Sequence, residues 1–311
     1  MAAQASPMAA PTDWQAAREQ MRALGPRWTA DIAAGRRAVL DAYTPLLAQA
    51  GTDGYTVTRD LPYGPHARHR LDVYRPQGPV TSPLPVVVFV HGGGFVRGDM
   101  NANAQIYGNV PRWFARHGCV AVNVEYRLAP EASFPGGARD VAAAMHWVRE
   151  TIGEFGGDVS RILLIGHSAG GSHVASYLCD PRLRPALPEV AGTVLISARL
   201  RADVLPDNPN AGGVVAYYGD DAARYDEDAP MAHAADMPVP AMIVVAEYEN
   251  PHLDTYALEF CHRLSQRDRH APRFVQVRDH NHTSVVAHLD TGDDALGREI
   301  LQFLHELNPS P

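Results

Sequence analysis

Apolar residues recur at helical spacing through the first 50 residues. One series consists of Trp14, Ala17, Met21 and Leu24, and a second runs over residues 32–47, after Gly25-Pro26. This spacing predicts two amphipathic helices over about residues 13–50, with a break near the proline. Their apolar faces need a surface to cover. They either form a lid over an active site, with Trp14, Met21 and Trp28 facing substrate, or pack against the flank of a sheet.

Strand patterns alternate with helical ones in the rest of the chain. Residues 55–61 and 69–74 alternate apolar and polar positions around a Pro-Tyr-Gly-Pro turn, which predicts an edge hairpin. Apolar runs that predict further strands occupy residues 86–90, 119–124, 161–165, 192–197, 241–246 and 273–277. Helical patterns lie at residues 103–117, 140–150 and 172–178. The chain therefore reads as one large α/β domain.

The hexapeptide Gly-His-Ser-Ala-Gly-Gly at residues 166–171 separates one of these strands from the helix that follows it. A G-x-S-x-G sequence at a strand-to-helix turn is typical of a nucleophile elbow, in which the serine hydroxyl projects above the sheet. The helix N-terminus beneath it favours developing negative charge. Ser168 is therefore the candidate nucleophile. The alternative is a glycine-rich turn with an incidental serine.

A second glycine cluster, His91-Gly92-Gly93-Gly94, follows the strand at residues 86–90. It lacks the G-x-G-x-x-G spacing of a dinucleotide site, so no nucleotide cofactor is expected. Consecutive glycines at a strand end can turn their N–H groups toward a ligand oxygen, as in an oxyanion loop. Gly93 and Gly94 would supply two donors and Ala169 a third. His91 is expected to pin this loop, with a role as catalytic base as the alternative.

Composition and charge exclude several classes of function. The chain has 311 residues, a net charge of −8 and no lysine, so Ser-Lys dyads and Schiff-base lysines are excluded. The negative charge disfavours nucleic acid as a partner and, more weakly, strongly anionic substrates. Cys119, Cys179 and Cys261 are too scattered for a disulfide framework or a metal site. The Asp-rich stretch at 220–228 lacks the spacing of a calcium loop, and no metal is expected.

Location is predicted from what the sequence lacks. Residues 1–12 have no basic start and no continuous apolar core, so no signal peptide is expected. No apolar run approaches the length of a membrane span. We therefore expect a cytoplasmic protein without membrane contact. The sequence does not determine the oligomeric state, and a homodimer stays open.

Five motifs occur in a fixed order with loop-sized gaps. They are H-G-G-G-F at 91–95, Y-R-L-A-P-E at 126–131, F-P at 134–135, Asp140 with Trp147, and the 166–171 hexapeptide. This order resembles the hormone-sensitive-lipase-like branch of the α/β-hydrolase family over about residues 70–178, and weakly in the last third. The resemblance implies the α/β-hydrolase fold, with a mostly parallel eight-stranded sheet flanked by helices. Residues 1–50 would form an N-terminal helical cap and 51–311 the catalytic domain, in one domain overall.

The same resemblance suggests roles for charged residues near the site. Glu125, Arg127 and Glu131 would form a structural network behind it, and residues 198–238 occupy the place where the family often inserts lid elements. The triad acid should follow the strand at 241–246. Glu249 fills the position where the family commonly has Asp, and Asp254 and Glu247 are alternatives.

The base should come from the loop at residues 279–285, where His280 and His282 compete. The N-H-x-S run resembles the C-terminal histidine loop of formamidase- and feruloyl-esterase-like relatives, which favours His282. A Ser168–His282–Glu249 triad needs no cofactor. We expect a serine hydrolase that cleaves small or short-acyl carboxylic esters through an acyl-enzyme. An arylformamidase-like amide hydrolase is the alternative, and a non-catalytic ligand receptor on the same fold is a remote one.

Overall fold

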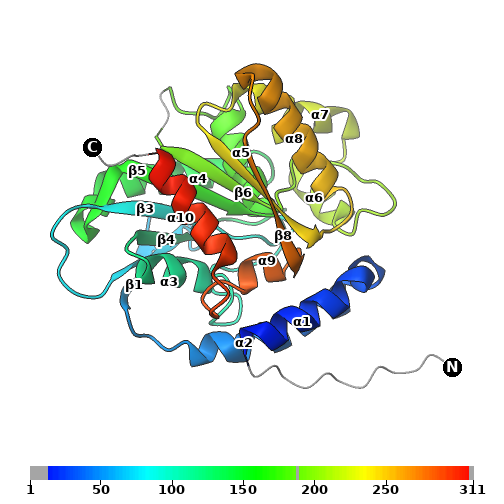
Figure 1. The fold of residues 1–311 in the computed structure, drawn as a ribbon. Coiled ribbons are helices and arrows are strands. Elements are labelled where there is room, and N and C mark those ends of the chain that lie inside the picture. Colours follow the sequence, from blue (N-terminus) through cyan, green and yellow to red (C-terminus); the bar gives the residue numbers. More distant parts are fainter. Residues whose placement is uncertain (1–12, 187–188, 308–311) are drawn as a thin grey trace.

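An eight-stranded sheet forms the centre of the computed structural model, which describes residues 13–186 and 189–307 (Figure 1). The strand order is β1-β2-β4-β3-β5-β6-β7-β8. The bounds of the strands are β1 Tyr55–Pro62, β2 Arg70–Pro76, β3 Leu84–Val90, β4 Val120–Val124, β5 Gly157–His167, β6 Gly192–Ile196, β7 Ala241–Tyr248 and β8 Arg273–Asn281. Strands β3 to β8 run parallel, whereas β2 is antiparallel to both β1 and β4. The mostly parallel sheet and its edge hairpin are thus confirmed.

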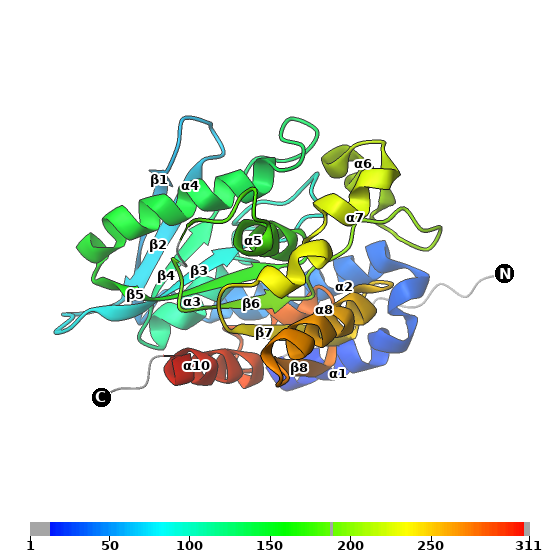
Figure 2. The same ribbon diagram turned by 90° about the horizontal axis from the view of Figure 1, so that it is seen from above.

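Helices cover both faces of the sheet because its strands are apolar on both sides (Figure 2). In β3, Val86, Val88 and Val90 pack in one core with α4 (Gly136–Thr151), α5 (Ala169–Cys179) and α8 (Leu253–Asp268). Val87 and Phe89 face the opposite core, which contains α3 (Asn109–Arg116), α9 (Ser284–Ala287), α10 (Ala295–Leu307) and the N-terminal helices. Outside these layers lie α6 (Ala211–Tyr218), α7 (Tyr225–Asp228) and the 3₁₀ helix at 222–224. The 3₁₀ helices at 152–155 and 230–236 contribute Ile152, Met231 and Ala234 to the core that contains α4 and α5.

The N-terminal segment folds as α1 (Trp14–Leu24), a 3₁₀ helix (Gly25–Ala30) and α2 (Ile32–Gln49), so the predicted break at the proline is confirmed. Both expectations for these helices hold in part. Met21 is buried in the core under the sheet, and Trp28 is buried but also lines the cavity at the candidate site. Trp14 packs beside Gly292. The prediction that Trp14 and Met21 face substrate is therefore wrong.

The helix predicted at residues 103–117 is shorter than expected. It begins at Asn109, because the Asn103 side chain accepts hydrogen bonds from the N–H groups of residues 105 and 106 and holds a turn there. In the described part of the chain, no helix is both long enough and apolar enough to cross a membrane.

Candidate active site

The candidate nucleophile sits in a strained turn between β5 and α5. Ser168 has φ 55° and ψ −119°, a backbone conformation that non-glycine residues rarely adopt. Its N–H donates to the Ile196 carbonyl of β6 (2.9 Å). A Cβ on Gly170 would lie 2.3 Å from the Val90 and His91 carbonyl oxygens, and one on Gly166 would lie 2.6 Å from Gly171 Cα. The two flanking glycines are therefore required by close backbone approach.

His282 and Glu249 lie in line with Ser168. His282 Nε2 is 3.0 Å from Ser168 Oγ, and its Nδ1 is 2.8 Å from Glu249 Oε2. The other Glu249 oxygen accepts hydrogen bonds from the Ala246 N–H (2.8 Å) and from the Ser197 hydroxyl. His282 and Glu249 are each only 8% exposed. The three side chains come from the ends of β5, β7 and β8, which meet at one edge of the sheet.

The competing acids lie elsewhere. Glu247 accepts from the Asp279 N–H (2.7 Å) at the β7–β8 junction, and Asp254 is exposed in the first turn of α8. His280 lies between Ser284 Oγ (3.1 Å) and Asp293 (3.4 Å) and stacks on His288. The structure therefore brings His282, and not His280, to the serine.

His167, the variable residue before the serine, supports the base and was not singled out from the sequence. Burial, followed by the charge of His282, holds the pKa of His167 well below its ordinary value, so the ring is neutral. Its Nε2–H donates to the His282 carbonyl (3.0 Å), and its Nδ1 faces the Tyr107 hydroxyl (3.4 Å). His167 thus holds the His282 loop from below. The sequence showed a histidine directly before the serine, but it did not show that this histidine bonds to the His282 carbonyl.

The glycine loop after β3 borders the same space. Gly93, Gly94 and Ala169 all line the cavity beside Ser168. Within residues 13–186 and 189–307, no protein group accepts a hydrogen bond from their three N–H groups. Gly94 has φ 59°, and a Cβ there would lie 2.4 Å from Asn210 Oδ1. Asn210 thus packs closely against Gly94, and the three N–H groups beside the cavity have no acceptor within the described chain.

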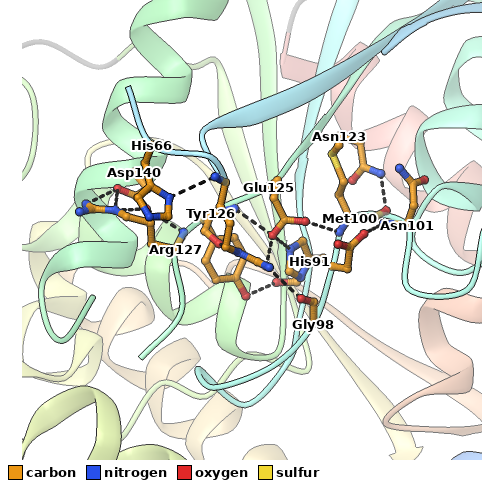
Figure 3. Close-up of polar contacts among 12 residues, drawn as sticks. His66, His91, Gly98, Met100, Asn101, Asn123, Glu125, Tyr126, Arg127 and Asp140 are labelled. Carbon is orange, nitrogen blue, oxygen red and sulfur yellow. Dashed lines mark hydrogen bonds and ion pairs between the residues drawn. The ribbon is translucent and has the colours of Figure 1, made fainter. Parts of the chain in front are cut away.

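A polar network behind the loop keeps it in place (Figure 3). The Glu125 carboxylate lies 3.1 Å from His91 Nε2, accepts from the Met100 N–H (2.8 Å) and pairs with Arg68. Burial raises the pKa of Glu125, but the bonds to His91 and its other partners outweigh it and lower that pKa overall. His91 Nδ1 donates to the Gly92 carbonyl (2.8 Å). His91 therefore pins the loop, as predicted.

A second ion pair continues the network, and one predicted member is missing from it. Arg127 binds Asp140 through its backbone N–H (2.9 Å) and its guanidinium (2.5 Å). Glu131, however, is largely exposed and pairs with His66 (3.0 Å) at the surface. The expectation that Glu131 belongs to the network is wrong, because its position on the loop directs it to solvent.

A cavity of about 560 Å³ opens above Ser168. Its walls include Trp28, Ile32 and Leu40 from the N-terminal helices, and Arg199, Pro209 and Asn210 from the segment expected to carry lid elements. Trp28 Nε1 donates to Asn250 Oδ1 (2.9 Å), which ties the helices to the residue after Glu249. Among the described residues, no cluster of three or more His, Cys, Asp or Glu could hold a metal ion.

Comparison with known proteins gives consistent results. The BD-FAE family model matches residues 71–179. Esterase LipC of Mycobacterium tuberculosis is 37% identical over 142 residues, which are 45% of this chain and 34% of LipC. Esterase LipI of the same organism is 31% identical over 223 residues, 61% of this chain and 68% of LipI. The matched region thus spans about a third of LipC and two-thirds of LipI.

The fold has a close structural counterpart. Esterase B of Lactobacillus rhamnosis, solved with a tributyrin phosphonate inhibitor, superposes with a TM-score of 0.72 at 19% identity. The alignment covers 93% of this chain and 96% of esterase B, which shows a shared fold. The match at 31% identity along two-thirds of LipI shows that the chain belongs to the hormone-sensitive-lipase-like carboxylesterases of the α/β-hydrolase family.

Proposed function

We propose that the protein is a serine carboxylesterase in which Ser168, His282 and Glu249 form the catalytic triad. The observation that carries the proposal is the continuous chain of contacts Oγ–Nε2 (3.0 Å) and Nδ1–Oε2 (2.8 Å) facing a cavity. Family membership supports it. Glu249 holds the imidazole in the tautomer that leaves Nε2 free to accept a proton, and it stabilises the ring when charged.

The reaction follows from these positions. Ser168 Oγ attacks the ester carbonyl while its proton passes to His282 Nε2. The oxyanion is bound by the N–H groups of Gly93, Gly94 and Ala169, where loss of one donor costs about 3 kcal/mol. Collapse breaks the bond to the alcohol oxygen, which takes the proton. Water then attacks the acyl-enzyme with the same base and releases the acid.

The cavity has room for a small ester, and Trp28 lies in its wall. A volume of about 560 Å³ is in the range of small-molecule sites. The bulky Trp28 in its wall limits the room for an extended acyl chain. We therefore expect acetate and butyrate esters to be better substrates than octanoate esters.

Hydrolysis of 4-nitrophenyl acetate, butyrate and octanoate tests the proposal. The parent should turn over the short esters, and Ser168→Ala should lower kcat by at least about 10⁴-fold. A 4-nitrophenyl phosphonate should release one equivalent of nitrophenol and leave a single adduct on the Ser168 peptide.

Two outcomes would count against the assignment. Equal turnover by Ser168→Ala would exclude Ser168 as nucleophile, and absence of any turnover or adduct would favour the receptor alternative. A 4-nitroanilide and N-formylkynurenine, assayed in parallel, test the amide-hydrolase alternative. Faster cleavage of either than of the esters would replace the ester assignment.

A further inference from the structure

The cavity above Ser168 has an unusual charge. Four arginines line it, namely Arg36, Arg37, Arg97 and Arg199. No aspartate or glutamate of the described chain lines it. Two of them lie on α2, and Arg97 follows the glycine loop, so segments distant in sequence bring positive charge to one wall. Arg97 is placed there by its N–H, which donates to the Gly93 carbonyl (3.1 Å).

Only Arg199 has its charge compensated within the described part of the protein. It pairs with Asp203 (3.0 Å) and donates to Asn208 (3.1 Å). In the part of the chain that the structure describes, the guanidinium groups of Arg36, Arg37 and Arg97 make no ion pair or hydrogen bond with a protein group. Three cations therefore line the cavity that also contains Ser168, without a counter-ion among the described residues.

The charge of Arg36 affects the pKa of two other groups that line the cavity, Arg97 and His167. Burial lowers the pKa of the Arg97 guanidinium first, and the charge of Arg36 lowers it further. The Arg36 charge also contributes to the low pKa of His167, after burial and the charge of His282. Arg36 is half-buried and Arg97 is exposed. Like charges near one another repel, and a bound anion would relieve that repulsion.

We propose that the substrate of this esterase carries a carboxylate in addition to its ester group, and that Arg36 and Arg97 bind that carboxylate. A guanidinium presents two parallel N–H donors that match the two oxygens of a carboxylate. The substrate class is thus half-esters of dicarboxylic acids, or esters of hydroxy acids with a free carboxyl group. The inference rests on the esterase function proposed above.

Matched pairs of substrates test it on both sides of the ester bond. On the acyl side, 4-nitrophenyl hydrogen adipate is compared with 4-nitrophenyl methyl adipate. On the alcohol side, 4-acetoxybenzoate is compared with methyl 4-acetoxybenzoate. In at least one pair, kcat/KM of the anion should exceed that of the neutral ester by about 10-fold or more, since hydrogen bonds to charged groups are strong. That preference should shrink toward ~0.5 M salt.

Variants assign the preference to the arginines. Arg36→Gln and Arg97→Gln should each reduce the anion-to-neutral ratio of kcat/KM at least threefold. Arg22→Gln, which removes one exposed arginine of α1 that does not line the cavity, should keep the ratio. A parent that cleaves neutral esters but shows no preference for the anion in either pair overturns this inference and leaves the esterase function standing. A preference that persists in both cavity variants also overturns it, whereas no cleavage of any ester overturns the function itself.

Discussion

At the scale of single residues, the proposed triad acid illustrates how one side chain is positioned. Glu249 is one methylene longer than the aspartate common in this family, and its carboxylate still meets His282 Nδ1 at 2.8 Å. The Ala246 N–H and the Ser197 hydroxyl hold its second oxygen. These contacts come from the ends of neighbouring strands, and they orient the longer side chain.

Replacing the carboxylate by its amide tests this role. Glu249→Gln should reduce kcat by about 10²–10⁴-fold, because the amide no longer fixes the required tautomer or stabilises the charged ring. Steady-state kinetics on 4-nitrophenyl butyrate measure the effect. Asp254→Asn is the matched control: it changes an exposed carboxylate away from His282, and its kcat should stay within about twofold of the parent. The reverse pattern would move the acid to Asp254.

At the scale of elements, the β5–turn–α5 unit depends on how closely α5 approaches β3. A Cβ on Gly170 would lie 2.3 Å from the Val90 and His91 carbonyl oxygens. These atoms belong to the backbone of a central strand and of the pinned glycine loop, so neither can shift freely. The elbow glycine is thus part of the packing between two elements, as well as of the turn.

Replacing Gly170 by alanine should therefore destabilise the fold. Gly170→Ala should lower the free energy of unfolding by about 2–3 kcal/mol or more. Gly212 is the control, since it lies exposed in α6 and no heavy atom lies within 4 Å of the position that an alanine methyl group would take. Gly212→Ala should raise the free energy by about 0.5–1 kcal/mol, because alanine is the better helix former. Urea titrations measure both, and equal effects at the two sites would contradict the close packing.

Elements with strong local signals were predictable. The break at Pro26, the edge hairpin and the apolar strands all follow from residue types that act over a few positions. The start of α3 was not, because a side-chain turn at Asn103 competes with the helix. The positions of Trp14 and Met21 could not be predicted either, since long-range contacts decide which surface an amphipathic helix packs against.

At the scale of the whole molecule, buried neutral histidines connect the fold to pH. Burial lowers the pKa of His173 and of His288 to about 3, and it is the main reason that the pKa of His167 is also low. In the unfolded chain these rings have a pKa near 6.5. Between pH values of about 6.5 and about 3 the unfolded state therefore binds protons that the native state does not.

Stability should consequently fall as the solution is acidified below about pH 6.5 and recover as the pH rises. Each such histidine contributes up to about 1.4 kcal/mol per pH unit in this window. His173→Phe should lose less of its free energy of unfolding between about pH 7 and pH 5 than the parent, as measured by urea titration. Tyr217→Phe, which alters an aromatic neighbour of His173 without removing a histidine, should keep the parental slope. Parallel curves for parent and His173→Phe would contradict a neutral buried ring.

At the scale of the whole molecule, the net charge of the protein also differs in sign from the charge of its cavity wall. The overall charge of −8 favours neutral or cationic substrates, yet the cavity wall holds arginines that lack counter-ions within the described chain. A sum over 311 residues carries no information about which charges converge. The proposed carboxylate site is therefore invisible in the composition.

Short-range chemistry, which can be read along the chain, accounts for one part of this protein. The elbow around Ser168, the glycine loop and the order of strands and helices are encoded by residues that are adjacent in sequence. Tertiary packing selected which histidine and which acid reach the serine, placed His167 beneath His282, and brought the arginines of α2 to the cavity. These outcomes depend on the register and order of β5, β7 and β8 and on the docking of the N-terminal helices, which only long-range contacts set.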